Sequence, residues 1–584
     1  MTRWPGRAGP AGPVGHARSK GMNAGRTGLI AIAASILCTF AVAVVGPSVM
    51  EPMLPGRSGQ PPWSLGLHPS AYLVVPLTAA GLAAGTLGLV LALRAIRGGW
   101  SVPARAILIA GLLAAAALTL VPPFGSSDHL SYAAYGRMLV TGHNPYTTTP
   151  AQLAALGDPV ARAVQDWSGA PSVYGPLATA IQALASLAGG TSVRLTVFVL
   201  GLANLIAFGV TALLLHRMTR DSPARQLRAA LLWAANPLLL QVLVAGGHVD
   251  SQAVVFGVAA CACVSRASPG GRPPGPPGPP LTPRGGYGGA GSPPVPPWGG
   301  PLGAPWPGWG RWVAAGVLVG LGFGVKVTVA LVGLGLAIGL VLVMGGQWRR
   351  VVGPLVALGA GFAVTAGAAV ALGGSAMLQQ SSRASDMVSI GSPWRVIRTI
   401  IQLVVKGTAA TDLVKFGAIA LAAVLAVLII RGLPGILPGR DPDAGALGGP
   451  GYAVAGVAFA LVLAWLFAWP YVLPWYDALG WALLPLIPMV SAPVVDGICW
   501  VLLARTAALG FGYLPARATD VTMPPGLTWL QPVIRHGVTP AVLAAATVWL
   551  VVLMVRSGRR RGDPDDPRAP GNSADPRTAA TKAG

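Results

Sequence analysis

Residues 27–46 read TGLIAIAASILCTFAVAVVG, a run of 20 residues without a charged side chain. The hydrocarbon core of a bilayer is about 30 Å thick, and an α-helix needs about 20 apolar residues to cross it. Comparable stretches recur along the chain, and each predicts a transmembrane helix. They lie near residues 70–94, 104–123, 193–215, 229–246, 249–265, 351–373, 412–431, 452–469, 474–491, 494–511 and 538–556.

The composition supports the same fold class. Hydrophobic residues make up 53% of the 584-residue chain and charged residues only 10%, whereas soluble domains carry about 25% charged residues. A formal net charge of +23 would favour nucleic-acid binding in a soluble protein, but here the arginines cluster between apolar runs, as in membrane proteins. The sequence therefore predicts an all-α polytopic membrane protein and excludes a soluble enzyme or a nucleic-acid binder.

Arginine positions predict the orientation in the membrane, because short cytoplasmic loops are enriched in Lys and Arg. Residues 1–26, 94–105 and 216–228 are basic, so we expect them in the cytoplasm. The large first loop, residues 124–192, is then extracytoplasmic. This arrangement requires residues 172–189 to lie on the outer face or dip into it without crossing.

Residues 311–345 are long enough for a tight hairpin of two short spans or for one long tilted helix. Only the hairpin keeps the later basic loops in the cytoplasm. It gives about 14 transmembrane helices, with both termini cytoplasmic.

The chain divides by composition into five parts. Residues 268–308 contain 15 Pro and 13 Gly, a composition that cannot bury a core. The parts are a basic cytoplasmic N-terminus (1–26), an N-terminal transmembrane module (27–266) that contains loop 124–192, a disordered cytoplasmic linker (267–310), C-terminal transmembrane helices (311–556) and a disordered cytoplasmic tail (557–584).

An acidic motif directly follows the third predicted span: Gly-Ser-Ser-Asp-His-Leu-Ser-Tyr-Ala-Ala-Tyr-Gly-Arg, residues 125–137. If it is helical, Asp128, Tyr132 and Tyr135 share one face, with His129 and Arg137 nearby. A carboxylate beside tyrosines suits a sugar site, because tyrosine presents both an apolar ring and a hydrogen-bonding hydroxyl. The alternative role for Asp128 is to cap the helix.

Two turn-like motifs lie in the same loop. Residues 142–146, Gly-His-Asn-Pro-Tyr, contain Asn144 and Tyr146, and residues 172–176, Ser-Val-Tyr-Gly-Pro, contain Tyr174. They are candidate sugar-binding residues, although turns of this composition also serve structure alone.

Three ionisable residues lie at the edges of apolar spans or inside them. His248 and Asp250 belong to Gly-Gly-His-Val-Asp, residues 246–250, and Lys326 lies within the most apolar stretch. Two ligands do not make a metal site. A buried lysine needs an anion or a route to the membrane surface, so Lys326 at the outer tip of a hairpin is a candidate phosphate ligand.

Two aromatic motifs occupy the remaining outer loops. Trp394 and Arg395 belong to Ser-Pro-Trp-Arg, and Trp475 and Tyr476 follow Pro474 in a Pro/aromatic cluster that begins at Trp469. Arginine suits forked phosphate contacts, whereas the alternative for both motifs is anchoring at the membrane interface. With the predicted orientation, all these motifs fall on the extracytoplasmic side. Their convergence suggests a site for a lipid-linked sugar phosphate, with cations on the phosphate and aromatic residues on the sugar.

The order of the motifs resembles that of a known family. Asp128-x3-Tyr132, Asn144-Pro-Tyr146, Tyr174-Gly-Pro176, Asn236-Pro237 with Gly247-His-x-Asp250, Lys326 and Pro474-Trp-Tyr476 appear in that order. From about residue 30 to 555 the chain resembles the GT-C glycosyltransferases that use polyprenyl-phosphate sugars. Within that class it is most similar to the actinobacterial polyprenol-phosphate-mannose-dependent α-1,6-mannosyltransferases of the MptB type.

The resemblance implies an outer-face GT-C site that transfers mannose with inversion to a mannan or glycolipid acceptor in the cell membrane. It implies that Asp128 is the general base and makes Lys326 and Arg395 candidate phosphate ligands. No cofactor is implied, and a divalent metal is left open. Two alternatives remain at this point: a GT-C enzyme that uses another polyprenyl-phosphate sugar, and a transporter or flippase of lipid-linked sugars.

Overall fold

The computed structural model describes residues 13–265, 308–344, 347–405, 407–437, 449–487, 492–516 and 523–560. Within these ranges the chain is helical, and its β pairing is limited to an isolated bridge between Ser48 and Glu51. The predicted all-α fold is therefore confirmed. The linker 267–310 and the tail 557–584 fall almost wholly outside the described residues.

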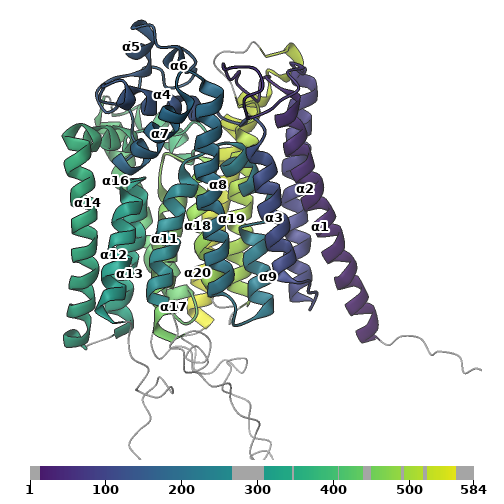
Figure 1. Ribbon diagram of the computed structural model, residues 1–584. Helices are drawn as coiled ribbons and strands as arrows, with labels where there is room; N and C mark the ends of the chain where they lie inside the picture. The colour runs from purple at the N-terminus through teal and green to yellow at the C-terminus, as the bar shows by residue number, and fades with distance from the viewer. Residues whose placement is uncertain are drawn as a thin grey trace, which may run out of the picture.

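The N-terminal helices form one side of an upright bundle, and α4 to α7 cover one end of it (Figure 1). The bundle helices are α1 (Pro13–Val45), α2 (Ala71–Arg97), α3 (Ala104–Thr119), α8 (Val193–Met218), α9 (Pro223–Leu232), α10 (Pro237–Leu239), the π-helix η1 (Leu240–Ala245) and α11 (Asp250–Ser265). The end cap is formed by α4 (Asp128–Val140), α5 (Pro150–Ala155), α6 (Pro159–Arg162) and α7 (Pro176–Gly189).

The C-terminal helices complete the bundle (Figure 1). They are α12 (Trp309–Phe323), η2 (Val327–Val329), α13 (Ala330–Met344), α14 (Trp348–Ser385), α15 (Pro393–Ile401), α16 (Ala409–Gly432), α17 (Gly449–Ala468), η4 (Pro474–Asp477), α18 (Ala478–Leu483), η5 (Leu484–Leu486), α19 (Ala492–Gly512), η7 (Pro525–Leu527), η8 (Gln531–Val538) and α20 (Thr539–Arg560).

Among the described residues, ten helices are long and apolar enough to cross a membrane, and four more, α3, α7, α11 and α12, are apolar but shorter. The chain is thus a multi-pass membrane protein, while the count of fourteen spans stays a prediction. The expected span 474–491 is not one α-helix. It is broken into η4, α18 and η5, because Pro474 is the first residue of η4 and Pro485 is the second residue of η5, and neither proline can donate a backbone hydrogen bond.

Residues 311–345 form the predicted hairpin. Helices α12 and α13 are antiparallel, since Val319 lies against Gly333 and Val329 lies against Gly322. Their connection, residues 324–326, carries Lys326 at its tip. The hairpin therefore presents a lysine at a turn, where a continuous helix would have buried it in mid-span.

Several basic helix ends are tied together by side-chain contacts. Arg97 at the end of α2 pairs with Asp496 near the start of α19, and the Arg225 guanidinium in α9 lies 5.3 Å from the ring centre of Tyr452 in α17. These helix ends lie opposite the cap of α4 to α7 (Figure 1). Gathering the basic loops at one end is what the predicted topology requires.

Candidate functional site

The acidic motif folds as predicted, with Asp128 in the first turn of α4. Ser127 occupies the cap position, so Asp128 is not the capping residue. The Asp128 backbone N–H donates to Ser126 Oγ at 3.1 Å, which fixes the start of the helix. The Asp128 side chain is left to make tertiary contacts.

The two carboxylate oxygens of Asp128 face different groups. Oδ1 accepts a hydrogen bond from Trp167 Nε1 at 3.2 Å, and Oδ2 lies 3.6 Å from His248 Nδ1. Burial, and after it the charge of Asp166, raises the pKa of Asp128 to about 6. Asp128 is thus ionised at neutral pH yet basic enough to accept a proton, as a general base requires.

Aromatic side chains surround this carboxylate. The Tyr174 hydroxyl donates to the Tyr132 hydroxyl at 3.2 Å, and the Tyr132 hydroxyl lies 3.5 Å from His248 Nδ1. The His248 ring stacks on Trp475 with 3.5 Å between ring centres. Burial lowers the pKa of His248 well below its ordinary value, so the imidazole is neutral.

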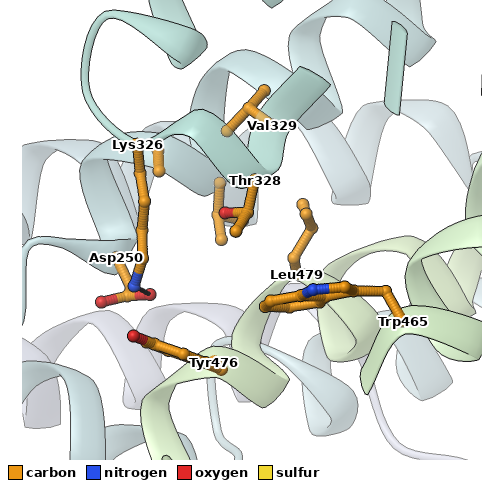
Figure 2. A pocket seen from close by; sticks show the side chains of 9 residues that line it. Asp250, Lys326, Thr328, Val329, Trp465, Tyr476 and Leu479 are labelled. Atoms are coloured by element: carbon orange, nitrogen blue, oxygen red, sulfur yellow. Dashed lines mark hydrogen bonds and ion pairs between the residues drawn. The ribbon is translucent and has the colours of Figure 1, made fainter. Parts of the chain in front are cut away.

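A buried ion pair lies beside this group. Lys326 Nζ donates to Asp250 Oδ1 at 2.6 Å and sits 3.7 Å from the ring centre of Tyr476. Figure 2 shows both contacts in a pocket that Trp465 and Thr328 also line. The second oxygen, Asp250 Oδ2, is buried and makes no hydrogen bond to any residue that the structure describes.

Backbone contacts hold the parts of the site together. The N–H groups of Gly175 and Leu177, at the start of α7, donate to the carbonyls of Val325 and Gly324 at 3.1 and 2.9 Å. A side chain at Gly175 would meet the Gly324 carbonyl oxygen at 2.2 Å, so only glycine fits. In turn, α7 packs on α4 at Gly136. These contacts hold the hairpin tip that carries Lys326 in place relative to Asp128.

Several predicted residues make local contacts in the same cap. Arg137 Nε donates to Asp158 Oδ2 at 2.7 Å, and the Tyr135 hydroxyl donates to the Ala170 carbonyl at 3.0 Å. Asn144 Oδ1 accepts from the Tyr146 N–H at 2.9 Å, which closes a turn.

Two other predicted residues lie in the same cap. The Tyr146 hydroxyl lies 3.1 Å from Thr179 Oγ1. His129 is buried in α4, behind Gly247.

The motif at 392–395 lies on a different helix. Trp394 in α15 donates from Nε1 to the Ala468 carbonyl at 2.7 Å, and Arg395 is exposed. Neither residue lines the pocket that contains Lys326. Of the two candidate phosphate ligands, Lys326 is therefore the one beside the Asp128 group.

Sequence reasoning missed three residues that matter here. Trp167 and Asp166, which contact or polarise Asp128, carry no recognisable motif. Arg505 pairs with the fully buried Asp477, Nε to Oδ1, at 2.8 Å. A signal for it existed, because an arginine within an apolar helix is itself unusual.

Within the described ranges, His, Cys, Asp and Glu side chains form no group of three or more suited to a metal ion. The site consists of the carboxylates of Asp128 and Asp250, a neutral imidazole, aromatic rings and one lysine.

Comparison with known proteins links this site to a family. The alpha-(1->6)-mannopyranosyltransferase N-terminal domain matches residues 26–344. The chain is 33% identical over 143 residues to a probable alpha-(1->6)-mannopyranosyltransferase of Mycolicibacterium smegmatis, covering 24% of this chain and 25% of that protein. It is 32% identical over 142 residues to an alpha-(1->6)-mannopyranosyltransferase of Mycobacterium tuberculosis, covering 24% of each. It is 28% identical over 137 residues to alpha-(1->6)-mannopyranosyltransferase B of Corynebacterium glutamicum, covering 23% of each.

These alignments span about a quarter of the length of each relative. No solved structure matches the chain. The family match, by contrast, extends over more than half of the chain and includes both Asp128 and Lys326. The chain belongs to the alpha-(1->6)-mannopyranosyltransferase family.

Proposed function

We propose that this protein transfers mannose from polyprenyl-phosphate mannose to a mannan or glycolipid acceptor, in α-1,6 linkage and with inversion, on the extracytoplasmic face. The observation that carries the proposal is the position of Asp128, a basic carboxylate set among tyrosines and His248, with Lys326 close by. Family membership supports mannose as the transferred sugar. The arrangement of basic helix ends opposite α4 supports the outer face as the location.

Asp128 would act as the general base. It accepts the proton of the acceptor hydroxyl while that oxygen forms a bond to the anomeric carbon. The bond between this carbon and the phosphate oxygen breaks, and its electron pair leaves with the phosphate. One displacement inverts the configuration, so one base suffices and no covalent intermediate forms.

Lys326 would stabilise the leaving phosphate. Its ammonium group can exchange part of its contact with Asp250 for the developing negative charge, and such preorganised charge stabilisation is a large contribution to catalysis. Tyr132, Tyr174 and the stacked His248–Trp475 pair offer hydroxyls and ring faces to the sugar.

A transporter is the less favoured reading. Transporters bind substrate near the membrane midplane, between repeated halves. Here α4, which carries Asp128, lies at one end of the bundle (Figure 1), and the hairpin tip that carries Lys326 is hydrogen-bonded to the start of α7 at the same end. This position favours transfer at a membrane surface.

The test is a transfer assay with membranes that contain the protein. Radiolabelled polyprenyl-phosphate mannose and an α-mannoside acceptor are supplied to the unchanged protein and to Asp128→Asn. The amide retains the shape of the side chain and still accepts the Trp167 hydrogen bond, but it cannot take a proton. We expect transfer to fall by about 10²–10⁴-fold, the usual contribution of a general base.

The matched control is Asp412→Asn, since Asp412 is an exposed acid in α16; it should transfer at the unchanged rate. Near-normal turnover by Asp128→Asn would remove Asp128 as the base. If the folded unchanged protein transfers no label, polyprenyl-phosphate mannose is not the donor, and other polyprenyl-phosphate sugars are tested next.

A labelling experiment tests the orientation. In a background without native cysteines, a cysteine at position 143 should react with an impermeant thiol reagent in whole cells. Protection there, combined with labelling of a cysteine in the 268–308 linker, would invert the topology.

A further inference from the structure

A second cavity is lined by Trp167, whose indole N–H donates to Asp128 Oδ1. It has a volume of about 240 Å³, and it is lined by Trp167, Tyr471, Tyr513, Arg535 and the segment Met387–Gly391. Pockets that enclose a whole small-molecule ligand commonly have about 300 to 1,000 Å³, so this cavity is slightly smaller than a pocket of that kind. None of these residues belongs to the pocket around Lys326.

Trp167 joins this cavity to the catalytic carboxylate. Its backbone has φ +65°, a left-handed conformation that is strained for a bulky residue. Its side chain is 43% exposed although it is apolar over most of its surface, and its indole N–H donates to Asp128 Oδ1. Strain of this kind persists mainly where the surrounding structure uses it for function.

The chemistry of inversion separates the two substrates. The acceptor hydroxyl attacks from the side opposite the phosphate, and the base must contact that hydroxyl. Asp128 Oδ2 faces His248, whose ring stacks on Trp475, and the neighbouring Tyr476 lies under Lys326. If the phosphate lies with Lys326, the acceptor approaches from the Oδ1 side, where Trp167 connects the carboxylate to the second cavity.

The lining suits a sugar chain. Trp167, Tyr471 and Tyr513 offer aromatic faces for pyranose rings. The Arg535 guanidinium lies 5.1 Å from the Tyr513 ring centre and forms no ion pair with any acid that the structure describes, so its N–H donors are available to hydroxyl groups.

We propose that this cavity, between Trp167 and Arg535, binds the growing end of the acceptor, an α-linked mannoside chain. Trp167 stacks on the terminal sugar and also fixes the carboxylate that activates its hydroxyl. The proposal rests on the proposed function, because it assigns the second substrate of the same reaction.

The test measures each substrate separately with the full-length protein in lipid nanodiscs. The probes are radiolabelled polyprenyl-phosphate mannose and octyl α-1,6-dimannoside. Four variants are compared with the unchanged protein: Trp167→Ala, Trp167→Phe, Tyr513→Ala and Arg535→Ala. Trp348→Ala is the matched control, since Trp348 is 66% exposed at the start of α14.

We expect Trp167→Ala, Tyr513→Ala and Arg535→Ala to raise the KM for the dimannoside by about tenfold, as expected for a lost stacking or hydrogen-bonding partner. The KM for the donor should stay within about twofold. Trp167→Phe keeps a ring face, so its dimannoside KM should change by less than about threefold. Hydrolysis of the donor by water, which needs no acceptor, should persist in Tyr513→Ala and Arg535→Ala.

Binding of the dimannoside is also measured directly, in the absence of donor. Variants whose transfer is too slow for a KM to be determined can then still be compared by their affinity. Unchanged affinity in all three alanine variants overturns the proposal. A raised donor KM with an unchanged dimannoside KM also overturns it and assigns the cavity to the lipid-linked donor. Absence of mannose transfer by the unchanged protein is a different failure, because it refutes the proposed function itself.

Discussion

Asp166 and Trp167 act on the Asp128 carboxyl in opposite directions, and this makes the role of Asp128 testable by pH. The charge of Asp166 raises the pKa of Asp128, and the hydrogen bond from Trp167 lowers it. If Asp128 is the base, as we propose, it works only when ionised, so the transfer rate should rise with pH through the pKa of Asp128. For the unchanged protein that rise is centred at about pH 6.

The direction of each shift follows from the structure. The pKa of Asp128 moves from 3.8 to about 6, with burial as the largest cause and Asp166 as the second. Asp166→Asn removes only the charge, so we expect the rise to move down by about half a unit to one unit, or about 0.7–1.4 kcal/mol. Trp167→Phe removes a hydrogen bond to a charged group and should move it up by a similar amount.

The assay is single-turnover transfer from radiolabelled donor at saturating substrate, between pH 4.5 and 8. Asp412→Asn controls for the loss of a carboxylate elsewhere and should leave the profile in place. Shifts in the same direction for Asp166→Asn and Trp167→Phe, or no shift in either, would refute Asp128 as the titrating base.

Three further substitutions probe the supports of the site. Lys326→Met should abolish transfer in the transfer assay, and it should lower the melting temperature in detergent because it leaves the Asp250 charge unpaired. Adding Asp250→Asn should restore the melting temperature but not the transfer activity. Arg505→Met leaves the Asp477 charge buried and unpaired and should destabilise the fold by about 3–5 kcal/mol; pairing it with Asp477→Asn should recover most of the folded yield, and no recovery would contradict the ion-pair account. Gly136→Val should lower the melting temperature and the activity together, because a Cβ there would lie 2.1 Å from a backbone oxygen of α7; an unchanged melting temperature would show that α4 and α7 are not closely packed.

The apolar runs predicted most of the fold because membrane-spanning length is a direct physical requirement. The hairpin at 311–345 was predicted by topology, since only two crossings kept the later basic loops on one side. The expected span at 474–491 failed as a single helix because hydropathy does not record where prolines interrupt the hydrogen-bond ladder. Hydropathy therefore predicts which stretches of the chain are apolar, but it does not predict where the backbone of such a stretch is interrupted.

The site could be predicted from the sequence where a charged residue lies at or within an apolar span, because burying a charge there costs free energy. Asp128, Asp250 and Lys326 stood out for that reason. In the structure Lys326 contacts Asp250, and the charges of both residues act on the carboxyl of Asp128. Trp167 and Asp166 did not, because nothing local in the sequence indicates that they face Asp128. Their roles depend on how the loop folds over α4, which spacing alone does not reveal.

The Asp250–Lys326 contact joins residues that are 76 positions apart in the chain. Residues 266–307 lie between them, and they connect the end of α11 to the start of α12, the helix ends farthest from the ion pair. A change in the length of this connection should therefore leave the Asp250–Lys326 contact intact. For protein engineering, it is the natural place to divide the chain. Each fragment would carry one partner of the ion pair, so the rate of sugar transfer would report directly on how well the two fragments reassociate.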